Sequence, residues 1–441
     1  MSARIVFIIL GFLNMVWFFI KYQISYIQRG KTLPAEVSDI YDAERYQTFL
    51  NYEAESTRLA AFRRAVLFVV LSIITLSPVY EWIEKFADKN IYIILLITIV
   101  MQYTIEEVFE LPFFYYGVFT IEEKYGLNKS DKKTFFKDTL VEYFTNLIMS
   151  IGLLEIVVFM FNKAQTVSIS TTLGYGKAFL VCLAMALGMF ILIVIMVVIQ
   201  IISLRLQYKF TPLEEGDLRN KINHLQESSR KKVKRIYVYD ESKKTTSKNA
   251  FLLKFLFFRE FGIADNFLNE NSERELLAVL SHEIGHLKHK KTFLNYLKII
   301  ILIIMFMALW YILANPHLLS GRPVFENWII KSFNLTVYNY YLNLALLTGL
   351  FKPLYFLLPL VENYRQRQEE YEADQEAVKN GYGEDLINTF KEMSSDELID
   401  INPHPIMVFL YYDHPTIYQR IVAIREGIIR QQKEKPFTVD T

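Results

Sequence analysis

Long apolar runs separated by charged stretches dominate the hydropathy pattern of the chain. A helix needs about 20 mostly apolar residues to cross a bilayer. We interpret the first run as a retained membrane helix and not as a signal peptide, because further runs follow it and no small-residue cleavage site does. The pattern predicts seven transmembrane helices, at residues 5–20, 66–79, 91–103, 146–161, 179–204, 294–313 and 342–360.

The basic residues predict how these helices are oriented. Lys and Arg are frequent after the first and third apolar runs and sparse after the second and fourth. Cytoplasmic loops of membrane proteins carry the excess of positive charge. We therefore expect the odd-numbered loops, including the long one after the fifth run, to lie in the cytoplasm.

Four glutamates, Glu106, Glu107, Glu110 and Glu155, lie in or beside apolar runs. Charges at membrane depth are costly and usually face a bundle interior or a watery cavity. Two interpretations stay open for residues 106–110. They lie at the membrane interface, or they belong to the polar interior of a hollow bundle.

The main hydrophilic stretch, residues 205–275, predicts a charged helix at 216–234 and two strands. The sequence RIYVY at 235–239 alternates polar and β-favouring residues, and an aromatic run follows at 251–258. A strand at the edge of a binding site can bind an extended peptide through main-chain hydrogen bonds.

Composition agrees with a membrane protein and limits its chemistry. Of the 441 residues, 52% are hydrophobic, and the mean hydropathy is +0.21. The net charge of +1 gives no general affinity for nucleic acid. The single cysteine, Cys182, excludes an internal disulfide framework and a Cys-rich zinc module.

The candidate chemistry lies in the sequence LLAVLSHEIGHLKHKK, where His282, Glu283 and His286 form the pattern H-E-x-x-H. Residues four apart share a face of a helix, so the two imidazoles could hold one Zn²⁺ ion. Glu283 could accept a proton from a water that the metal activates.

The alternative is a surface helix with two solvated histidines. Three of the seven histidines, including His289, fall within eight residues, which favours the metal site. Gly285 costs the helix about 1 kcal/mol relative to Ala, which suggests that another element approaches closely there.

A catalytic zinc needs a third protein ligand. The acidic helix predicted at 364–382 contains Glu370 and Asp374, which are four apart and share a face. One carboxylate could bind zinc while the other orients a ligating imidazole. Spacing leaves the choice among the carboxylates open, and a solvated acidic helix is an equal alternative.

Six segments together resemble the integral-membrane CAAX prenyl proteases of the Ste24 type, which are zinc metalloproteases of peptidase family M48. In chain order they read IEEKYGLNKSDKKTFFKD, YKFTPLEEG, SKNA, SHEIGH, EYEAD and DHPTIYQR. Lys248 and Phe251 depart from the family pattern in the SKNA loop, and Leu287 stands where the family often has an aromatic residue. These departures concern the details of substrate recognition and not the metal site.

The resemblance implies a role for each site residue. Glu370 would be the third ligand of one zinc ion beside His282 and His286, and His289 would be a neighbour only. Asp374 would orient a zinc histidine.

The other implied roles concern catalysis and the substrate. Glu283 would be the general base, and His414 would donate to the developing oxyanion. Asn249 and Ala250 would grip the substrate backbone, and Arg420 would line the site.

The implied fold is a mainly α membrane protein, with seven transmembrane helices forming a hollow bundle and an inserted gluzincin-like zinc metalloprotease domain. We expect helices one to five in residues 1–204, the zinc-protease segment in 205–293, helices six and seven in 294–360, and the segment with the third ligand in 361–441.

The implied function is removal of the C-terminal tripeptide from isoprenylated CAAX proteins or peptides. The expected partners are this substrate and the lipid bilayer, without nucleic acid. The membrane would be the endoplasmic reticulum in a eukaryote or the inner membrane in a bacterium, with the active site on the cytoplasmic side. The alternatives are a quality-control zinc protease without a prenyl requirement, and a non-enzymatic scaffold or transporter.

Overall fold

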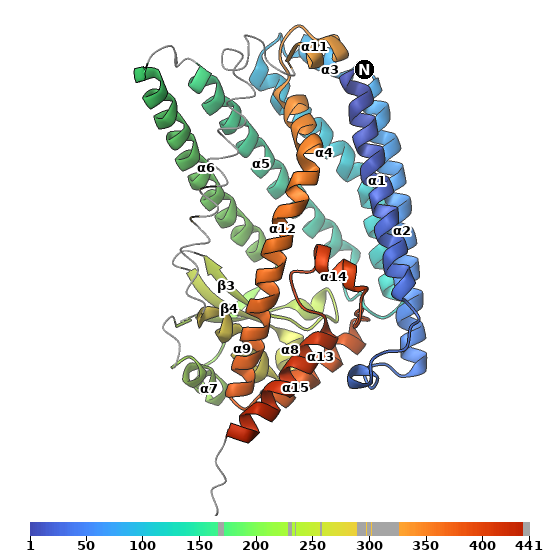
Figure 1. Cartoon of the computed structure of the whole chain (residues 1–441), viewed down its shortest axis with the longest axis vertical. Helices are drawn as coiled ribbons and strands as arrows, with labels where there is room; N and C mark the ends of the chain where they lie inside the picture. The colour runs from blue at the N-terminus through green and yellow to red at the C-terminus, as the bar shows by residue number, and fades with distance from the viewer. Residues whose placement is uncertain are drawn as a thin grey trace, which may run out of the picture.

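The computed structural model is elongated, with long helices at one end and a small sheet with shorter helices at the other (Figure 1). It describes residues 1–165, 172–227, 232–233, 235–255, 258–288, 297, 301 and 326–434. The N-terminus and the short helices α3 (Val79–Phe86) and α11 (Glu326–Phe333) lie at the end remote from the sheet (Figure 1).

Five helices in the described part of the chain are long and apolar enough to cross a membrane, which confirms the first five predicted spans. They carry exposed large apolar side chains such as Phe12, Ile73 and Ile148, as expected for surfaces that face lipid. The helices are α1 (Ala3–Gln28), α2 (Ala43–Leu76), α4 (Ile91–Tyr116), α5 (Lys132–Gln165) and α6 (Thr172–Gln207).

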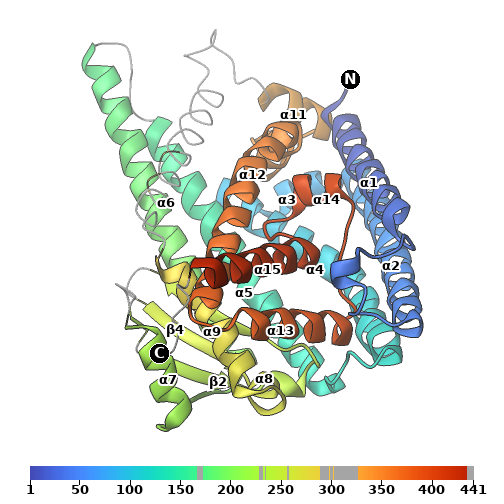
Figure 2. The same cartoon turned by 60° about the horizontal axis from the view of Figure 1, so that its bottom comes forward.

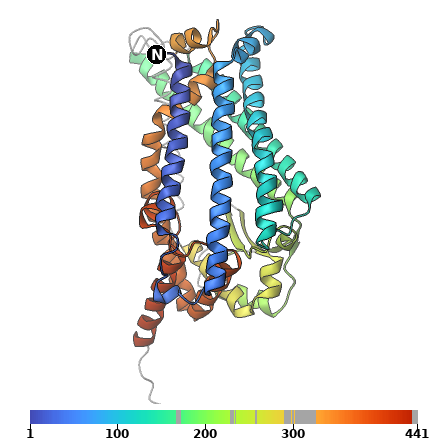
Figure 3. The ribbon, with the colours of Figure 1, turned by 90° about the vertical axis from the view of Figure 1, so that its right-hand side faces the viewer.

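The helices are longer than the apolar runs that predicted them. Helix α2 begins far before residue 66, because Asp42 caps it by accepting from the Arg45 amide and no Gly or Pro interrupts residues 43–65. It ends at Leu76, just before Pro78. Figure 3 shows α1 and α2 side by side along the length of the molecule.

The last two predicted spans have different outcomes. Residues 294–313 lie outside the described residues, apart from 297 and 301. The seventh predicted span falls within α12 (Tyr340–Lys379), a single helix that runs through Pro353 and Pro359 from the bundle into the domain with the sheet (Figure 1). The expected domain boundary at residue 361 therefore falls inside a continuous helix.

A cavity of about 300 Å³ lies among α1, α2, α4 and α12. Glu106 and Glu110 line it together with Asn14 and Arg64, so these glutamates face a space between helices that also contains other polar side chains. This arrangement favours the interpretation of a polar bundle interior over a position at the membrane interface.

The sheet has four strands in the order β1-β2-β4-β3, of which β2 and β4 are parallel and the other pairs antiparallel. The predicted strand at 235–239 is confirmed as β2. The predicted strand at 251–258 is confirmed over 251–255 as β3, but its last residue, Phe258, belongs to β4. The strands are β1 (Phe210–Pro212), β2 (Arg235–Tyr239), β3 (Ala250–Phe255) and β4 (Phe258–Ala264).

The charged helix predicted at 216–234 is also wrong in length. Helix α7 covers only Asp217–Leu225, and the Gln226 side chain then accepts a hydrogen bond from the Val233 amide at 2.5 Å.

Two hydrophobic cores hold the end that contains the sheet together. One packs α7 and α9 (Glu273–Lys288) against the sheet through Phe261, Leu280 and Ile284. The other joins the α1–α2 connection to the last helices, which lie across the end of the bundle in Figure 2. The remaining elements are α8 (Asp265–Glu270), α13 (Gly383–Asp396), α14 (Pro405–Tyr411), α15 (Ile417–Glu434) and the short turns η1 (Ala35–Val37), η2 (Gly117–Glu122) and η3 (Glu241–Lys243).

Candidate metal centre

The H-E-x-x-H sequence lies on α9, as predicted. Ser272 and Glu275 start this helix with a capping box: the Ser272 amide donates to the Glu275 carboxylate at 2.9 Å, and the Glu275 amide donates to the Ser272 hydroxyl at 3.3 Å. The apolar face that includes Leu280 and Ile284 is buried against the sheet. The opposite face presents His282 and His286 to α12.

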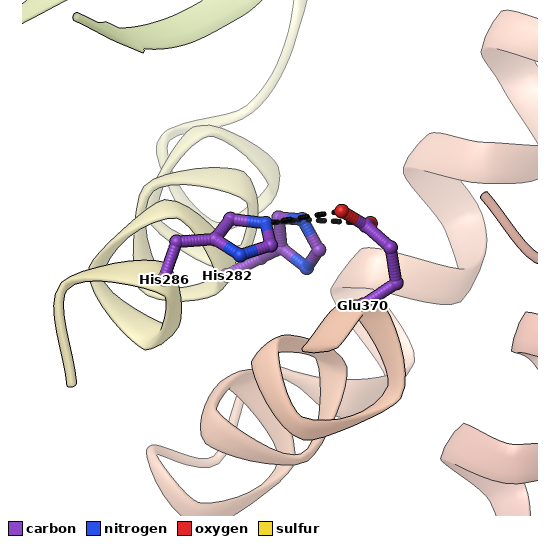
Figure 4. A group of neighbouring side chains, drawn as sticks. All are labelled: His282, His286 and Glu370. Atoms are coloured by element: carbon purple, nitrogen blue, oxygen red, sulfur yellow. Dashed lines mark hydrogen bonds and ion pairs between the residues drawn. The ribbon is translucent and has the colours of Figure 1, made fainter. Parts of the chain in front are cut away.

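Helices α9 and α12 bring three possible metal ligands together (Figure 4). The Nε2 atoms of His282 and His286 are 3.2 Å apart, and they lie 3.5 and 3.2 Å from the two Glu370 carboxylate oxygens. Ligands held at about 2.0–2.1 Å by a tetrahedral zinc are roughly 3.4 Å apart. The spacing of these atoms therefore suits a single small divalent metal ion.

Asp374 lies behind His282. Its Oδ1 atom is 2.9 Å from the His282 Nδ1 atom, so it can orient the imidazole from the side remote from Glu370. The Arg420 guanidinium donates to both Asp374 oxygens, at 2.6 and 2.9 Å. Burial opposes ionisation of Asp374, but the Arg420 charge holds the pKa of this carboxyl below its usual value.

Arg420 is buried and lies within 3.5 Å of Glu370 as well as against Asp374. It also borders the cavity at the metal centre. Burial opposes ionisation of Glu370, yet the hydrogen bond with His286 and the Arg420 charge hold the Glu370 pKa at about 2. Arg420 thus keeps two carboxylates at the centre charged.

Glu283 lines the same cavity beside the histidines. Burial raises the pKa of this carboxyl, while the neighbouring imidazoles of His282 and His286 oppose the rise. A carboxyl with a raised pKa is better matched to exchanging a proton near neutral pH.

His414 approaches from the segment between α14 and α15. Its Nε2 atom is 3.4 Å from a Glu370 oxygen, and its Nδ1 atom is 2.8 Å from the Asp413 carboxylate. More than half of the side chain is exposed, so His414 borders the open side of the centre.

The cavity beside these residues has a volume of about 360 Å³. Asn249 and Ala250 line it where β3 begins, and β3 is the edge strand of the sheet. The facing wall comes from α13, through Leu386, Phe390 and Met393. This wall was not predicted from the sequence, although the i, i+4, i+7 spacing of its three apolar residues is a signal of a helix face.

His289, the remaining histidine of the cluster, lies outside the described residues. Among the described residues, the group that could hold a metal ion consists of His282, His286 and Glu370, whose ligand atoms all lie within 4.8 Å of one another.

Curated relatives and a solved structure are similar to this chain over most of its length. "Probable CAAX prenyl protease 1" of Schizosaccharomyces pombe is 29% identical over 91% of this chain and 84% of its own length. "CAAX prenyl protease 1" of Saccharomyces cerevisiae is 27% identical over 71% of this chain and 68% of its own. The crystal structure of S. mikatae Ste24p has the same fold, with a TM-score of 0.75 at 21% identity over 96% of this chain and 99% of that one.

Two family descriptions match consecutive parts of the chain. "CAAX prenyl protease N-terminal, five membrane helices" matches residues 23–203, and "Peptidase family M48" matches residues 212–428. The protein is therefore a multi-pass membrane metalloprotease, and it belongs to the Ste24-type CAAX prenyl proteases of peptidase family M48.

Proposed function

We propose that this protein is a zinc-dependent endopeptidase that removes the C-terminal tripeptide from isoprenylated CAAX proteins or peptides. The observation that carries the proposal is the convergence of His282, His286 and Glu370 beside a cavity bordered by an edge strand. The names of the curated relatives supply the substrate class.

The donor set favours zinc as the metal. Two neutral imidazoles and one carboxylate leave a further coordination position open, which is typical of catalytic zinc sites. Zinc held by His282, His286 and Glu370 would supply a Lewis acid that acidifies a water and polarises the scissile carbonyl.

The protein's own residues would move the protons and hold the substrate. Glu283 would accept the proton of the attacking water and deliver it to the leaving amine. The exposed position of His414 beside Glu370 supports a role as hydrogen-bond donor to the developing oxyanion. Asp374 and Arg420 would keep His282 and Glu370 oriented.

The substrate would bind as an extended strand. Within the described residues, no strand pairs with the outer side of β3, so this side can form main-chain hydrogen bonds with a peptide, starting at Asn249 and Ala250. Side chains of such a peptide alternate between two sides, and those on one side would face Phe390 and Met393 of α13.

We further infer that residues 294–313 and 342–360 complete a seven-helix hollow bundle in the membrane. The cavity lined by Glu106 and Glu110 supports a hollow interior. The distribution of basic residues supports a cytoplasmic active site. The membrane would be the endoplasmic reticulum in a eukaryote or the inner membrane in a bacterium.

Cleavage of matched peptides tests the function. Purified full-length protein is given a CAAX peptide with a farnesylated cysteine and the same peptide without the farnesyl group, and products are identified by mass spectrometry. We expect release of the C-terminal tripeptide from the farnesylated peptide with a clearly higher kcat/KM.

The variant Glu283→Gln serves as the control. It should retain its metal while turnover falls by a factor of about 10² or more, because the general base is lost. Equal cleavage of both peptides would instead support a quality-control protease. A purified protein without metal or peptidase activity would support the scaffold or transporter alternative.

A further inference from the structure

Lys248 is a buried cation at the start of the substrate-facing edge strand. Its side chain is only 6% exposed, although most lysines lie in solvent. The ammonium is 2.7 Å from Glu392, 3.5 Å from Asp396 and 3.7 Å from Glu270. Burial opposes its charge, but Glu392 and the other carboxylates raise the Lys248 pKa above its usual value, so the group is charged.

A second set of hydrogen bonds joins the same two elements. The Ser247 hydroxyl and the Lys248 amide both donate to the Glu397 carboxylate, at 2.9 and 3.1 Å. Glu392 and Asp396 belong to the last turn of α13, and Glu397 follows directly. The residues just before β3 are therefore attached to the C-terminal end of α13.

These attachments connect the two walls of the cleft at the metal centre. Asn249 and Ala250 follow Lys248 directly and line one wall. Phe390 and Met393 lie on α13 beside Glu392 and line the other wall. A change in the distance between Lys248 and Glu392 therefore changes the width of the space between the walls.

We infer that Lys248 is a positioning residue that sets the width of the substrate cleft, and thereby the size of the substrate side chain that fits against α13. The inference rests on the proposed function.

The charges explain why the effect should be specific to the cleft. In Lys248→Met, the carboxylates of Glu270, Glu392 and Asp396 lose their common cation and repel one another. The last turn of α13 would then move away from β3 while the metal ligands, on α9 and α12, stay in place. Lys248→Arg keeps the positive charge and should keep the cleft narrow.

The test compares farnesylated CAAX peptides that carry alanine or phenylalanine at the first or second residue after the cysteine. In Lys248→Met, we expect the ratio of kcat/KM for phenylalanine over alanine to rise about fivefold at one of these positions, through KM. Metal content should not change. Glu392→Gln should change the ratio in the same direction, which keeps the test valid if Lys248→Met does not fold.

The matched control is Arg274→Met, which removes an ion pair at the other end of α13. Arg274 contacts both Asp385 oxygens, at 2.8 and 2.9 Å, and is largely exposed. Its loss should leave the ratio unchanged, and Lys248→Arg should restore the wild-type ratio. An unchanged ratio in both Lys248→Met and Glu392→Gln, or an equal change in Arg274→Met, would overturn the inference.

Hydrogen exchange of the full-length protein separates this inference from the proposed function. Amides of residues 249–255 and 390–397 should exchange faster in Lys248→Met than in wild type, and not in Arg274→Met. If the wild type did not cleave farnesylated peptides, the proposed function would fail while exchange would still decide whether Lys248 holds the two walls together. Exchange rates in Lys248→Met equal to those of the wild type would refute the inference that Lys248 holds the two walls together.

Discussion

Gly285 of α9 lies so close to Ala373 of α12 that a Cβ atom at residue 285 would be 2.7 Å from the Ala373 Cα atom. The neighbouring atoms belong mainly to the backbone of α12, which cannot move aside as a flexible side chain can. Ala373 lies between Glu370 and Asp374. This contact therefore sets the distance between the histidines and both carboxylates.

Gly285→Ala should separate the two helices and weaken the metal centre. We expect a loss of about 1–3 kcal/mol of stability, typical of overpacking, together with a reduced metal content measured by mass spectrometry. Gly152→Ala on α5 is the control, because an added Cβ there meets nothing within 4 Å. Equal metal content in both variants would contradict this prediction.

Glu370→Gln should lose metal, whereas Glu369→Gln should not. Glu370 lies against both histidines, while the Glu369 carboxylate is paired with Arg365 on its own helix. The metal content of the two purified proteins, compared by elemental analysis, checks the prediction. Loss of metal in Glu369→Gln but not in Glu370→Gln would show that Glu370 is not the third ligand.

Asp374→Asn should reduce metal affinity by about 10–100-fold, the usual cost of losing a partner that orients a ligating histidine. It should also lower stability, because Arg420 would keep a buried charge without its closest anion. Competition with a metal indicator measures the affinity. Glu372→Gln changes an exposed carboxylate on the same helix and should leave the affinity intact.

Removal of the metal should lower the unfolding temperature of the wild type. The ion would join α9 to α12, and a ligand that binds only the folded state adds about 2.7 kcal/mol at 100 times its Kd. Thermal unfolding with and without a chelator measures this effect. His286→Ala should unfold at a lower temperature than the wild type, and the chelator should change its unfolding temperature little. If the chelator lowered the unfolding temperature of His286→Ala as much as that of the wild type, the stabilising ion would lie elsewhere.

Asp400→Asn should stabilise the protein near pH 7.5 and only about half as much near pH 5. Burial raises the pKa of Asp400 to about 6, and the nearby Glu53 carboxylate adds to the rise. At pH values between the pKa of Asp400 in the unfolded chain and about 6, the folded state keeps a proton on Asp400 that the unfolded state has lost. The stability of the wild type therefore falls as the pH rises through this range.

The expected gain for Asp400→Asn is about 3 kcal/mol at most, from the free energy of a pKa shift of this size. Unfolding in denaturant at the two pH values provides the measurement. Asp39→Asn, at an exposed aspartate of the same region, should show no such dependence. A gain that is the same at both pH values would contradict the assignment of the effect to Asp400 ionisation.

Much of the secondary structure at the centre could be predicted because its signals are local. The capping pair at Ser272 and Glu275 and the apolar face of α9 lie within a few turns of helix. Boundaries were predicted less well: the helix expected at 216–234 ends at Leu225, and the aromatic run at 251–258 contains the end of β3 and the start of β4.

The sequence by itself determined that His282 and His286 share a helix face with Glu283 beside them. The α-helical period of 3.6 residues depends only on residues that are close together along the chain, so spacing is enough to place these side chains. Residue spacing could not choose Glu370 among the acidic residues of α12. That choice depends on how α9 and α12 pack at Gly285 and Ala373, residues 88 positions apart. The resemblance to known proteases had named Glu370, but among physical arguments only the tertiary structure decided it, because packing between distant segments leaves no periodic signal in either one.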